Sequence, residues 1–327
     1  MCAQFLDYLN KQHPQIKFTV EMESDCVLPF RTMISALRQQ LDNGAEGLLL
    51  VDASNAFNTL NRRVMLHNVS ILCPSFAPCV VNYYRSNAQL FTSGEVIESM
   101  EGTTQGDPLS MAIYALATLP LIVRAQESIT AAIQSWFADD AGAARRLWCL
   151  FSWCTKLAAE GPQFGYNVNP PKTWLVVRDE HLQAAHDLFG LAGINITTEG
   201  RPVLGAPCGE EEYCRSFCSS SVMPWVSKVT KLAKFAKTQP HAAFAAFTHG
   251  LSSEWTYMSR SVPSLEDHLQ PLEDVNRRDF LPSLTGRAAS DLERNLLSLP
   301  ARSVLAEWPW GTHFRKHVPT MTRPLRS

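Results

Sequence analysis

Three short strings carry side chains that could do chemistry. Asp52 ends an apolar run, Gln105-Gly106-Asp107-Pro108-Leu109-Ser110 precedes a long apolar stretch, and Phe137-Ala138-Asp139-Asp140 follows a short one. Taken singly, each string also fits a helix cap or a turn. Taken together, Asp52 and Asp139 would converge if their two strands pair in one small sheet. Clustered carboxylates repel one another unless a cation lies between them, and hard oxygen ligands favour Mg²⁺. Two such ions can activate an attacking hydroxyl and neutralise a departing pyrophosphate, so the strings predict phosphoryl transfer.

The elements that must position these residues follow from the hydrophobic pattern. The continuous apolar run Gly47–Val51 predicts a strand buried on both faces, and residues 134–138 predict a second strand. Residues 109–126 predict a long apolar helix. Further predicted elements are helices over 31–41, 62–69, 76–84, 145–159 and 180–191, a hairpin of 89–92 with 95–98, and a strand over 173–177.

The pattern changes near residue 208. Before it, strands and helices intermix in an α+β arrangement; after it, helices are predicted over 210–237, 241–258, 265–280 and 288–297. The charge changes sign as well, since residues 1–214 hold 14 Lys and Arg against 22 Asp and Glu, and residues 215–327 hold 15 against 9. This split suggests a metal-binding site beside a surface for a polyanion, although uneven solvated faces give the same numbers.

Composition excludes several classes of protein. The 327 residues are 46% hydrophobic and 18% charged, which is unlike a disordered, collagen-like or coiled-coil chain. The longest apolar stretch, residues 111–123, contains Pro120 and is too short to cross a bilayer, so no membrane association is expected. The N-terminus lacks a secretory pattern, which predicts an intracellular protein and leaves nucleus and cytoplasm open. Neither a phosphate-binding loop nor a zinc motif is complete.

The order and spacing of the three strings resemble motifs A, B and C of the reverse transcriptase palm, in particular those of the retrotransposon and group II intron branch. Gly165-Tyr166-Asn167 with Lys172-Thr173 resembles motif D, and Leu204-Gly205-Ala206-Pro207 resembles motif E. The resemblance covers residues 48–209 and implies a right-hand polymerase fold of the α+β class. It implies partial, reduced fingers over 1–46, a ferredoxin-like palm over 47–208, a helical thumb over 209–302 and an unassigned tail over 303–327.

The resemblance implies an RNA-directed DNA polymerase that adds dNTPs to a primer 3′-hydroxyl on an RNA or DNA template. Asp52, Asp139 and Asp140 would be the catalytic carboxylates and, with the carbonyl of Ala53, would hold two Mg²⁺ ions, which Mn²⁺ can replace. Phe57 falls at the position that meets the sugar of the incoming nucleotide, although it also fits core packing. The alternative is a truncated, catalytically inactive retroelement-derived remnant that only binds nucleic acid.

The remaining expected contacts are with substrate and nucleic acid. Gln105 and Gly106 would lie against the template and the nascent base pair, and Lys172 would approach the leaving phosphate, unless it is simply an exposed lysine. Leu204 and Gly205 would form a turn under the primer strand. A basic stripe on a thumb helix would contact phosphates, unless it is only a solvated face; it consists of Lys228, Lys231, Lys234 and Lys237. The sequence does not indicate protein partners or oligomeric state.

Overall fold

The chain forms two units in the computed structural model, one within residues 1–214 and one within residues 215–327. The structure describes residues 16–19, 37, 39, 43–127, 129, 134–262 and 265–287. The expected helices over 31–41 and 288–297, most of the segment 1–46 and the tail 303–327 therefore lie wholly or largely outside the described residues.

A six-stranded sheet forms the centre of the first unit, in the order β1-β5-β6-β2-β7-β8. Strand β2 lies inside the sheet and pairs antiparallel with β6 and β7, whereas β1 with β5 and β7 with β8 are parallel pairs. The strands are β1 Ile16–Thr19, β2 Gly47–Val51, β5 Gln134–Phe137, β6 Asp140–Arg145, β7 Trp174–Val177 and β8 Asn195–Thr197. With the helices below, this mixed sheet confirms the α+β class.

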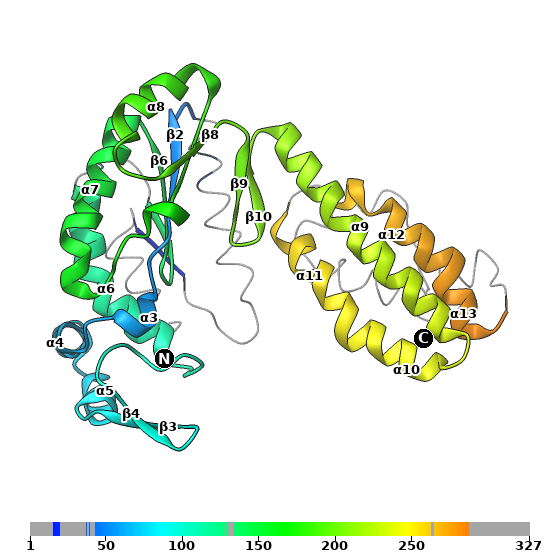
Figure 1. The fold of residues 1–327 in the computed structure, drawn as a ribbon, viewed down its shortest axis with the longest axis horizontal. Coiled ribbons are helices and arrows are strands. Elements are labelled where there is room, and N and C mark those ends of the chain that lie inside the picture. The colour runs from blue at the N-terminus through cyan, green and yellow to red at the C-terminus, as the bar shows by residue number, and fades with distance from the viewer. Residues whose placement is uncertain are drawn as a thin grey trace, which may run out of the picture. The chain divides into compact units, whose positions relative to one another are not determined.

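The apolar sequence of β2 explains its internal position. Leu49 and Val51 point to one face and join the main hydrophobic core, while Leu48 is completely buried on the other face. Helices α6 (Ser110–Glu127) and α7 (Leu147–Phe164) cover the first of these faces (Figure 1). A strand with apolar residues at successive positions is stable only where both of its faces are covered.

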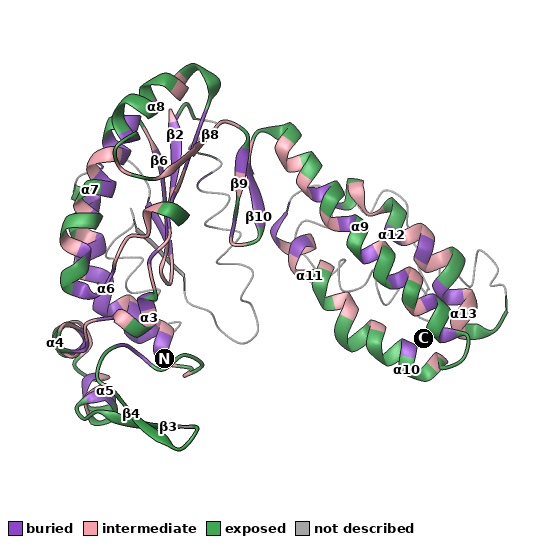
Figure 2. Cartoon of the chain, in the orientation of Figure 1, coloured by how far each residue is buried: buried purple, intermediate pink, exposed green. Residues whose placement is uncertain are grey.

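The other helices of this unit are shorter. They are α3 Ala56–Thr59, α4 Arg62–Leu72, α5 Ala77–Tyr84 and α8 Leu182–Phe189, with 3₁₀ turns at Pro170–Lys172 and Asp179–His181. Buried residues gather on β2, β6 and the facing sides of α6 and α7, while α8 is exposed along one side (Figure 2). The core of the unit therefore lies between the sheet and α6 and α7.

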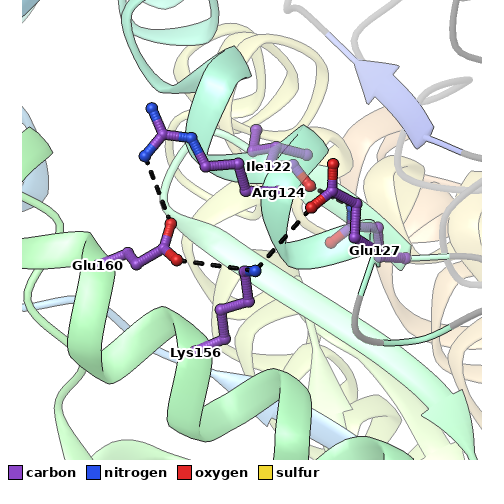
Figure 3. A network of polar contacts seen from close by, with 6 residues as sticks. Ile122, Arg124, Glu127, Lys156 and Glu160 are labelled. Atoms are coloured by element: carbon purple, nitrogen blue, oxygen red, sulfur yellow. Dashed lines mark hydrogen bonds and ion pairs between the residues drawn. The ribbon is translucent and has the colours of Figure 1, made fainter.

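Ion pairs also link α6 to α7 at their surface (Figure 3). Glu160 lies 3.5 Å from Arg124 and 3.6 Å from Lys156, and Lys156 lies 4.0 Å from Glu127. Partly exposed pairs of this kind each contribute about 0–1 kcal/mol. Apolar burial, rather than this network, accounts for most of the packing of the two helices.

Two separate hairpins complete the first unit. Strands β3 (Ala88–Thr92) and β4 (Glu95–Ser99) form one, and β9 (Gly200–Val203) and β10 (Ala206–Gly209) form the other. Each has a two-residue turn in which both residues have positive φ, 47° and 87° at Ser93-Gly94 and 49° and 80° at Leu204-Gly205. This is the turn geometry that matches the twist of antiparallel strands.

The second unit is helical. Its elements are α9 Glu211–Ala236, whose first residues belong to the first unit, α10 Pro240–Ala246, α11 Ser252–Ser261, α12 Gln270–Val275 and α13 Leu281–Thr285, with a 3₁₀ turn at Leu265–His268. Wider π-helical turns at Phe247–Leu251 and Asn276–Phe280 continue α10 into α11 and α12 into α13. The single helix expected over 241–258 is thus interrupted by a π-helical turn at Phe247–Leu251.

Strand β6 was not predicted from the sequence. Its residues, Asp-Ala-Gly-Ala-Ala-Arg, include no β-branched or aromatic side chain, and the alanines favour a helix when taken alone. Its position between β5 and β2 leaves room only for small side chains, and Ala141, Ala143 and Ala144 are all buried there. Tertiary packing therefore overrides local propensity at this strand.

Among the described helices, none is both long enough and apolar enough to cross a membrane.

Candidate active site

Three carboxylates meet at one end of the central sheet. Strand β2 ends at Val51 opposite Ala141, so Asp52 follows beside the start of β6 at Asp140. Phe137 pairs with Asp140, which places Asp139 in the two-residue turn between β5 and β6. The expected direct pairing of the two Asp-bearing strands is wrong, since β6 lies between β2 and β5. The turn of the β5–β6 hairpin nevertheless brings Asp139 to the end of β2.

Asp52 is held by the segment that follows α7. The backbone N–H of Asn169 donates to the Asp52 carbonyl at 2.8 Å, and its side-chain amide donates to Asp52 Oδ2 at 3.2 Å. Ala53 forms an isolated bridge with Val168, and the N–H of Ser54 donates to the Asn167 carbonyl at 2.8 Å. These contacts fix both the main chain and the carboxylate of Asp52.

Tyr166, in the same segment, fixes the turn that carries Asp139. Its hydroxyl donates to the Asp139 carbonyl at 3.1 Å, and its fully buried ring lies 5.4 Å from the Trp136 ring. One segment therefore positions both Asp52 and the Asp139 turn.

The carboxylates repel one another in a partly buried site. Burial raises the pKa of Asp140 to about 6, with the charges of Asp139 and Asp52 adding to the shift. Burial also raises the pKa of Asp139; a backbone hydrogen bond opposes this shift and the charge of Asp52 supports it. Desolvated carboxylates held close together are destabilised in their charged form, and a cation relieves this cost.

The donor set fits a hard divalent cation. Carboxylate and carbonyl oxygens are the ligands that Mg²⁺ takes, and the mutual repulsion of the three carboxylates favours a cation between them. Within the described residues, no group of three or more His, Cys, Asp or Glu side chains is arranged to hold an ion by itself. Mg²⁺ commonly binds through one or two carboxylates, with water and substrate phosphates as the other ligands. The oxygen donors present are therefore of the kind that Mg²⁺ takes, and they would supply only part of its coordination shell.

Phe57 lies on α3, five residues after Asp52. It is half-buried and packs against the core, and its ring stacks on that of Tyr114 from α6 at 4.7 Å between centroids. Tyr114 is 1% exposed, and its hydroxyl has no hydrogen-bond partner among the residues that the structure describes. Burial raises the pKa of Tyr114 well above its usual value, with the charges of Asp139 and Asp140 adding to the shift. Phe57 thus packs against the core and keeps part of its surface accessible.

Hydrogen bonds join the turn before α6 to α3 and α4. The N–H of Thr103 donates to the Phe57 carbonyl at 2.8 Å. Arg62, 7% exposed, donates to the carbonyls of Ser99, Glu101 and Gly102. Burial lowers the pKa of Arg62, and the charge of Glu101 opposes that shift. These carbonyl acceptors therefore compensate the burial of the Arg62 guanidinium. The same hydrogen bonds fix the segment that leads to Gln105.

Gln105 and Gly106 are exposed in this turn. Asp107 closes it, because the N–H of Leu109 donates to Asp107 Oδ1 at 2.8 Å and the N–H of Ser110 donates to its carbonyl. The structure thus presents Gln105 and Gly106 to solvent next to the element that carries Tyr114.

The other expected substrate residues lie in exposed turns. Lys172 ends the 3₁₀ turn Pro170–Lys172, three residues after Asn169, and is exposed. Leu204 and Gly205 form the tip of the β9–β10 hairpin, where Leu204 has a φ of 49°, which is unusual for a residue with a side chain. The structure places Lys172 in the same segment as the Asp52 contacts.

The expected basic residues all lie in or just after α9, within the second unit. Helical periodicity puts Lys231 and Lys234 opposite the buried face of that helix, which includes Trp225 and Val229, and puts Lys228 at the edge of that face. Lys228 forms an ion pair with Glu254, whereas Lys237 follows the helix end at Ala236. Lys228 is therefore the ion-paired member of the stripe, and all four lysines are exposed.

Sequence reasoning did not assign a role to Asn169, Tyr166 or Tyr114. Tyr166 belongs to the string that resembles motif D, which could have indicated its position. Tyr114 is the one residue with a polar hydroxyl on an aromatic ring in the apolar helix α6. A periodic pattern alone cannot show that this hydroxyl is buried near carboxylates from another part of the chain.

Comparison with known proteins gives matches in structure only. No protein-family model and no curated protein matches the sequence. The apo telomerase of Candida tropicalis matches 96% of this chain and 59% of its own length, at 10% identity and a TM-score of 0.50. The same telomerase truncated from its C-terminal domain matches 54% of this chain and 39% of its own length, at 13% identity and a TM-score of 0.41. Candida albicans telomerase in complex with a fragment of telomeric RNA matches 98% of this chain and 56% of its own length, at 8% identity and a TM-score of 0.41.

The chain thus spans between 39% and 59% of the length of these structures. The two matches at a TM-score of 0.41 are too weak to carry an argument. The match at 0.50, at 10% identity, bears on the fold alone. The chain therefore shares the general fold of the apo telomerase of Candida tropicalis.

Proposed function

We propose that the chain is an RNA-directed DNA polymerase, which adds dNTPs to a primer 3′-hydroxyl by phosphoryl transfer. The observation that carries this proposal is the arrangement of Asp52, Asp139 and Asp140 at one end of the central sheet. The telomerase-like fold supports it at the level of architecture. The motif strings favour the retrotransposon and group II intron branch, with 47–208 as palm, 209–302 as thumb and 1–46 as part of the fingers.

In this proposal the carboxylates of Asp52, Asp139 and Asp140 and the carbonyl of Ala53 hold two Mg²⁺ ions. Mg²⁺ held by these residues, or Mn²⁺ in its place, would supply the charge that favours attack by the 3′-hydroxyl and neutralises the leaving pyrophosphate. Asn169 and Tyr166 position the carboxylates before substrate arrives, so little reorganisation is needed at the moment of reaction.

The surrounding residues position substrate and nucleic acid. The Phe57 ring, held by Tyr114, contacts the sugar of the incoming nucleotide and excludes a 2′-hydroxyl. Lys172 donates a proton to, or stabilises the charge of, the leaving phosphate. Gln105 and Gly106 contact the template and the nascent pair, and the Leu204-Gly205 turn supports the primer.

A catalytically inactive protein that only binds nucleic acid is the second candidate. The observation that favours it is the exposure of Lys231 and Lys234 on α9, which needs no active site to attract phosphates. The two candidates share this binding surface and differ only in turnover.

One experiment separates the two candidates. The purified chain is given a primed RNA template, dNTPs and Mg²⁺ or Mn²⁺, and extension is compared with that of the Asp139→Ala/Asp140→Ala variant. Template binding is measured at several salt concentrations in parallel. Extension that disappears in the double variant, with binding retained, supports the polymerase. Salt-sensitive binding without extension by the parent protein supports the second candidate.

A further inference from the structure

A pocket of about 420 Å³ lies between α5 and the turn that precedes α6. Its α5 side includes Tyr83 and Tyr84, and its turn side includes Gln105, Gly106 and Asp107. This volume is within the range of small-molecule sites, about 300–1,000 Å³. None of the roles derived above uses the α5 side of the pocket.

Of the two tyrosines on the α5 side of the pocket, Tyr84 is held by hydrogen bonds and Tyr83 is largely exposed. Tyr84 is 4% exposed, and its hydroxyl accepts the N–H of Thr104 at 3.2 Å and donates to Asp107 Oδ2 at 3.5 Å. Tyr83 is 62% exposed, and its ring lies edge-on to that of Tyr84 at 4.9 Å. The rigid ring of Tyr84 therefore supports a neighbouring ring that has most of its surface available for stacking.

The lining residues indicate a neutral, planar ligand. The described residues that line the pocket include no Lys, Arg or His, and Asp107 is the one charged group among them. A triphosphate or another free anion is disfavoured at such a surface. A flat heterocycle can stack on Tyr83 while its polar edge reaches the Gln105 amide or Thr104.

Gln105 and Gly106 connect this pocket to the proposed active site. Both residues line the pocket, and Thr103, two residues earlier, is bonded to the Phe57 carbonyl. We propose that this pocket binds an unpaired nucleobase of the template strand, held by stacking on Tyr83, ahead of the position where nucleotides are added. This inference rests on the proposed polymerase function.

The test uses the full chain and two primed RNA templates that differ at one nucleotide. One template carries an adenine at the first unpaired position beyond the templating base, and the other is abasic there. Affinities are measured by fluorescence anisotropy at one fixed salt concentration for the parent, Tyr83→Ala, Tyr83→Phe and Phe91→Ala. Phe91 is a matched control, because it is 77% exposed and lies on β3 outside the pocket lining.

Stacking on an aromatic ring strengthens binding by about 5- to 100-fold per base. We therefore expect Tyr83→Ala and the abasic template each to weaken binding by such a factor, with no further loss when they are combined. Tyr83→Phe and Phe91→Ala should bind the adenine template as the parent does. Losses that add when combined, or an abasic template that binds as tightly as the adenine template, would overturn the inference.

A second readout locates the base directly. Cys79 is exposed and lines the pocket, so its alkylation by N-ethylmaleimide can be followed by peptide mass spectrometry. The adenine template should slow alkylation of Cys79 more than the abasic one does, and equal protection would contradict the proposal. If the parent extends primers and shows none of these effects, only the pocket assignment fails. If the parent binds no primed template, the proposed function and the pocket assignment both fail.

Discussion

The ring of Phe57, from the short helix after Asp52, stacks at 4.7 Å on the ring of Tyr114, from the second turn of the main apolar helix. Because Tyr114 is fully buried and Phe57 is half-buried, the Tyr114 ring is the inner partner of the stack and the Phe57 ring is the outer one. In the proposed function, the wall beside the nucleotide sugar would therefore be a pair of rings rather than one side chain.

This stack predicts that Tyr114 affects sugar selection without touching the substrate. Phe57→Ala should raise the use of rNTPs relative to dNTPs by about 10- to 100-fold, the range for one changed steric contact. Tyr114→Leu should raise it by a smaller factor, because Phe57 loses its support. The measurement is the ratio of kcat/KM for matched dNTP and rNTP in single-nucleotide addition.

Tyr114→Phe is the control, because it removes the hydroxyl and keeps the ring. It should discriminate between the sugars as the parent does. In the Phe57→Ala background, Tyr114→Leu should change the ratio no further. A Tyr114→Leu protein that is slower with both nucleotides by the same factor would show that Tyr114 has only a structural role.

Asp140 predicts a stability effect in the absence of metal. Its pKa is raised to about 6 in the folded protein, so the charged carboxylate destabilises the fold above that pH, and the cost disappears as pH falls below the unfolded value, about 4. Asp140→Asn should therefore increase the free energy of unfolding by about 2–3 kcal/mol at pH 8 and by little at pH 4. Urea unfolding in EDTA at both pH values measures this difference.

Asp187→Asn serves as the matched control for that experiment, since Asp187 is exposed on α8. It should change stability little at either pH. An Asp140→Asn protein no more stable than the parent at pH 8 would show that burial and repulsion at the site are weaker than the structure indicates.

A side chain at position 165 should destabilise the fold strongly through a steric clash. It has a φ of 80°, and a Cβ at this position would lie 1.8 Å from the Thr59 carbonyl oxygen. Gly94 has a similar φ of 87° and no atom within 4 Å of such a Cβ. Gly94→Ala should cost about 1–2 kcal/mol from its backbone conformation, and Gly165→Ala about 1–3 kcal/mol more from the added clash. Equal shifts of the two urea midpoints would contradict this close approach.

The lysines of α9 predict a graded salt dependence. Lys231→Gln/Lys234→Gln should lower the slope of log affinity against log salt for a single strand by about 0.7 per lysine. Lys228→Gln should change it little, because Glu254 already neutralises Lys228. Anisotropy titrations between about 50 and 200 mM salt give these slopes. Equal effects of all three lysines would mean that the Lys228–Glu254 pair opens on binding.

Local patterns predicted the elements that carry strong signals. The apolar run of β2, the hairpin around Ser93-Gly94 and the long helix α6 could be recognised from the sequence because burial and turn chemistry are local properties. The alanine-rich β6 could not, because only its neighbours β5 and β2 make it a strand.

The site shows the same division. The types and order of Asp52, Asp139 and Asp140 indicated a common site, although the strand that joins them was not foreseen. Asn169 and Tyr166 could not be assigned their contacts, since each depends on a hydrogen bond to a residue 117 or 27 positions away. Contacts of this kind can be assigned only from the folded structure and not from the sequence motif alone.

The most direct test of the polymerase proposal is single-nucleotide addition on a primed RNA template with Mg²⁺, one dNTP at a time. The parent and Asp187→Asn should add only the nucleotide complementary to the template, and Asp52→Asn, which preserves the shape of the side chain, should lose this activity. Addition by Asp52→Asn at the rate of the parent, or no addition by the parent, would contradict the assignment of these carboxylates.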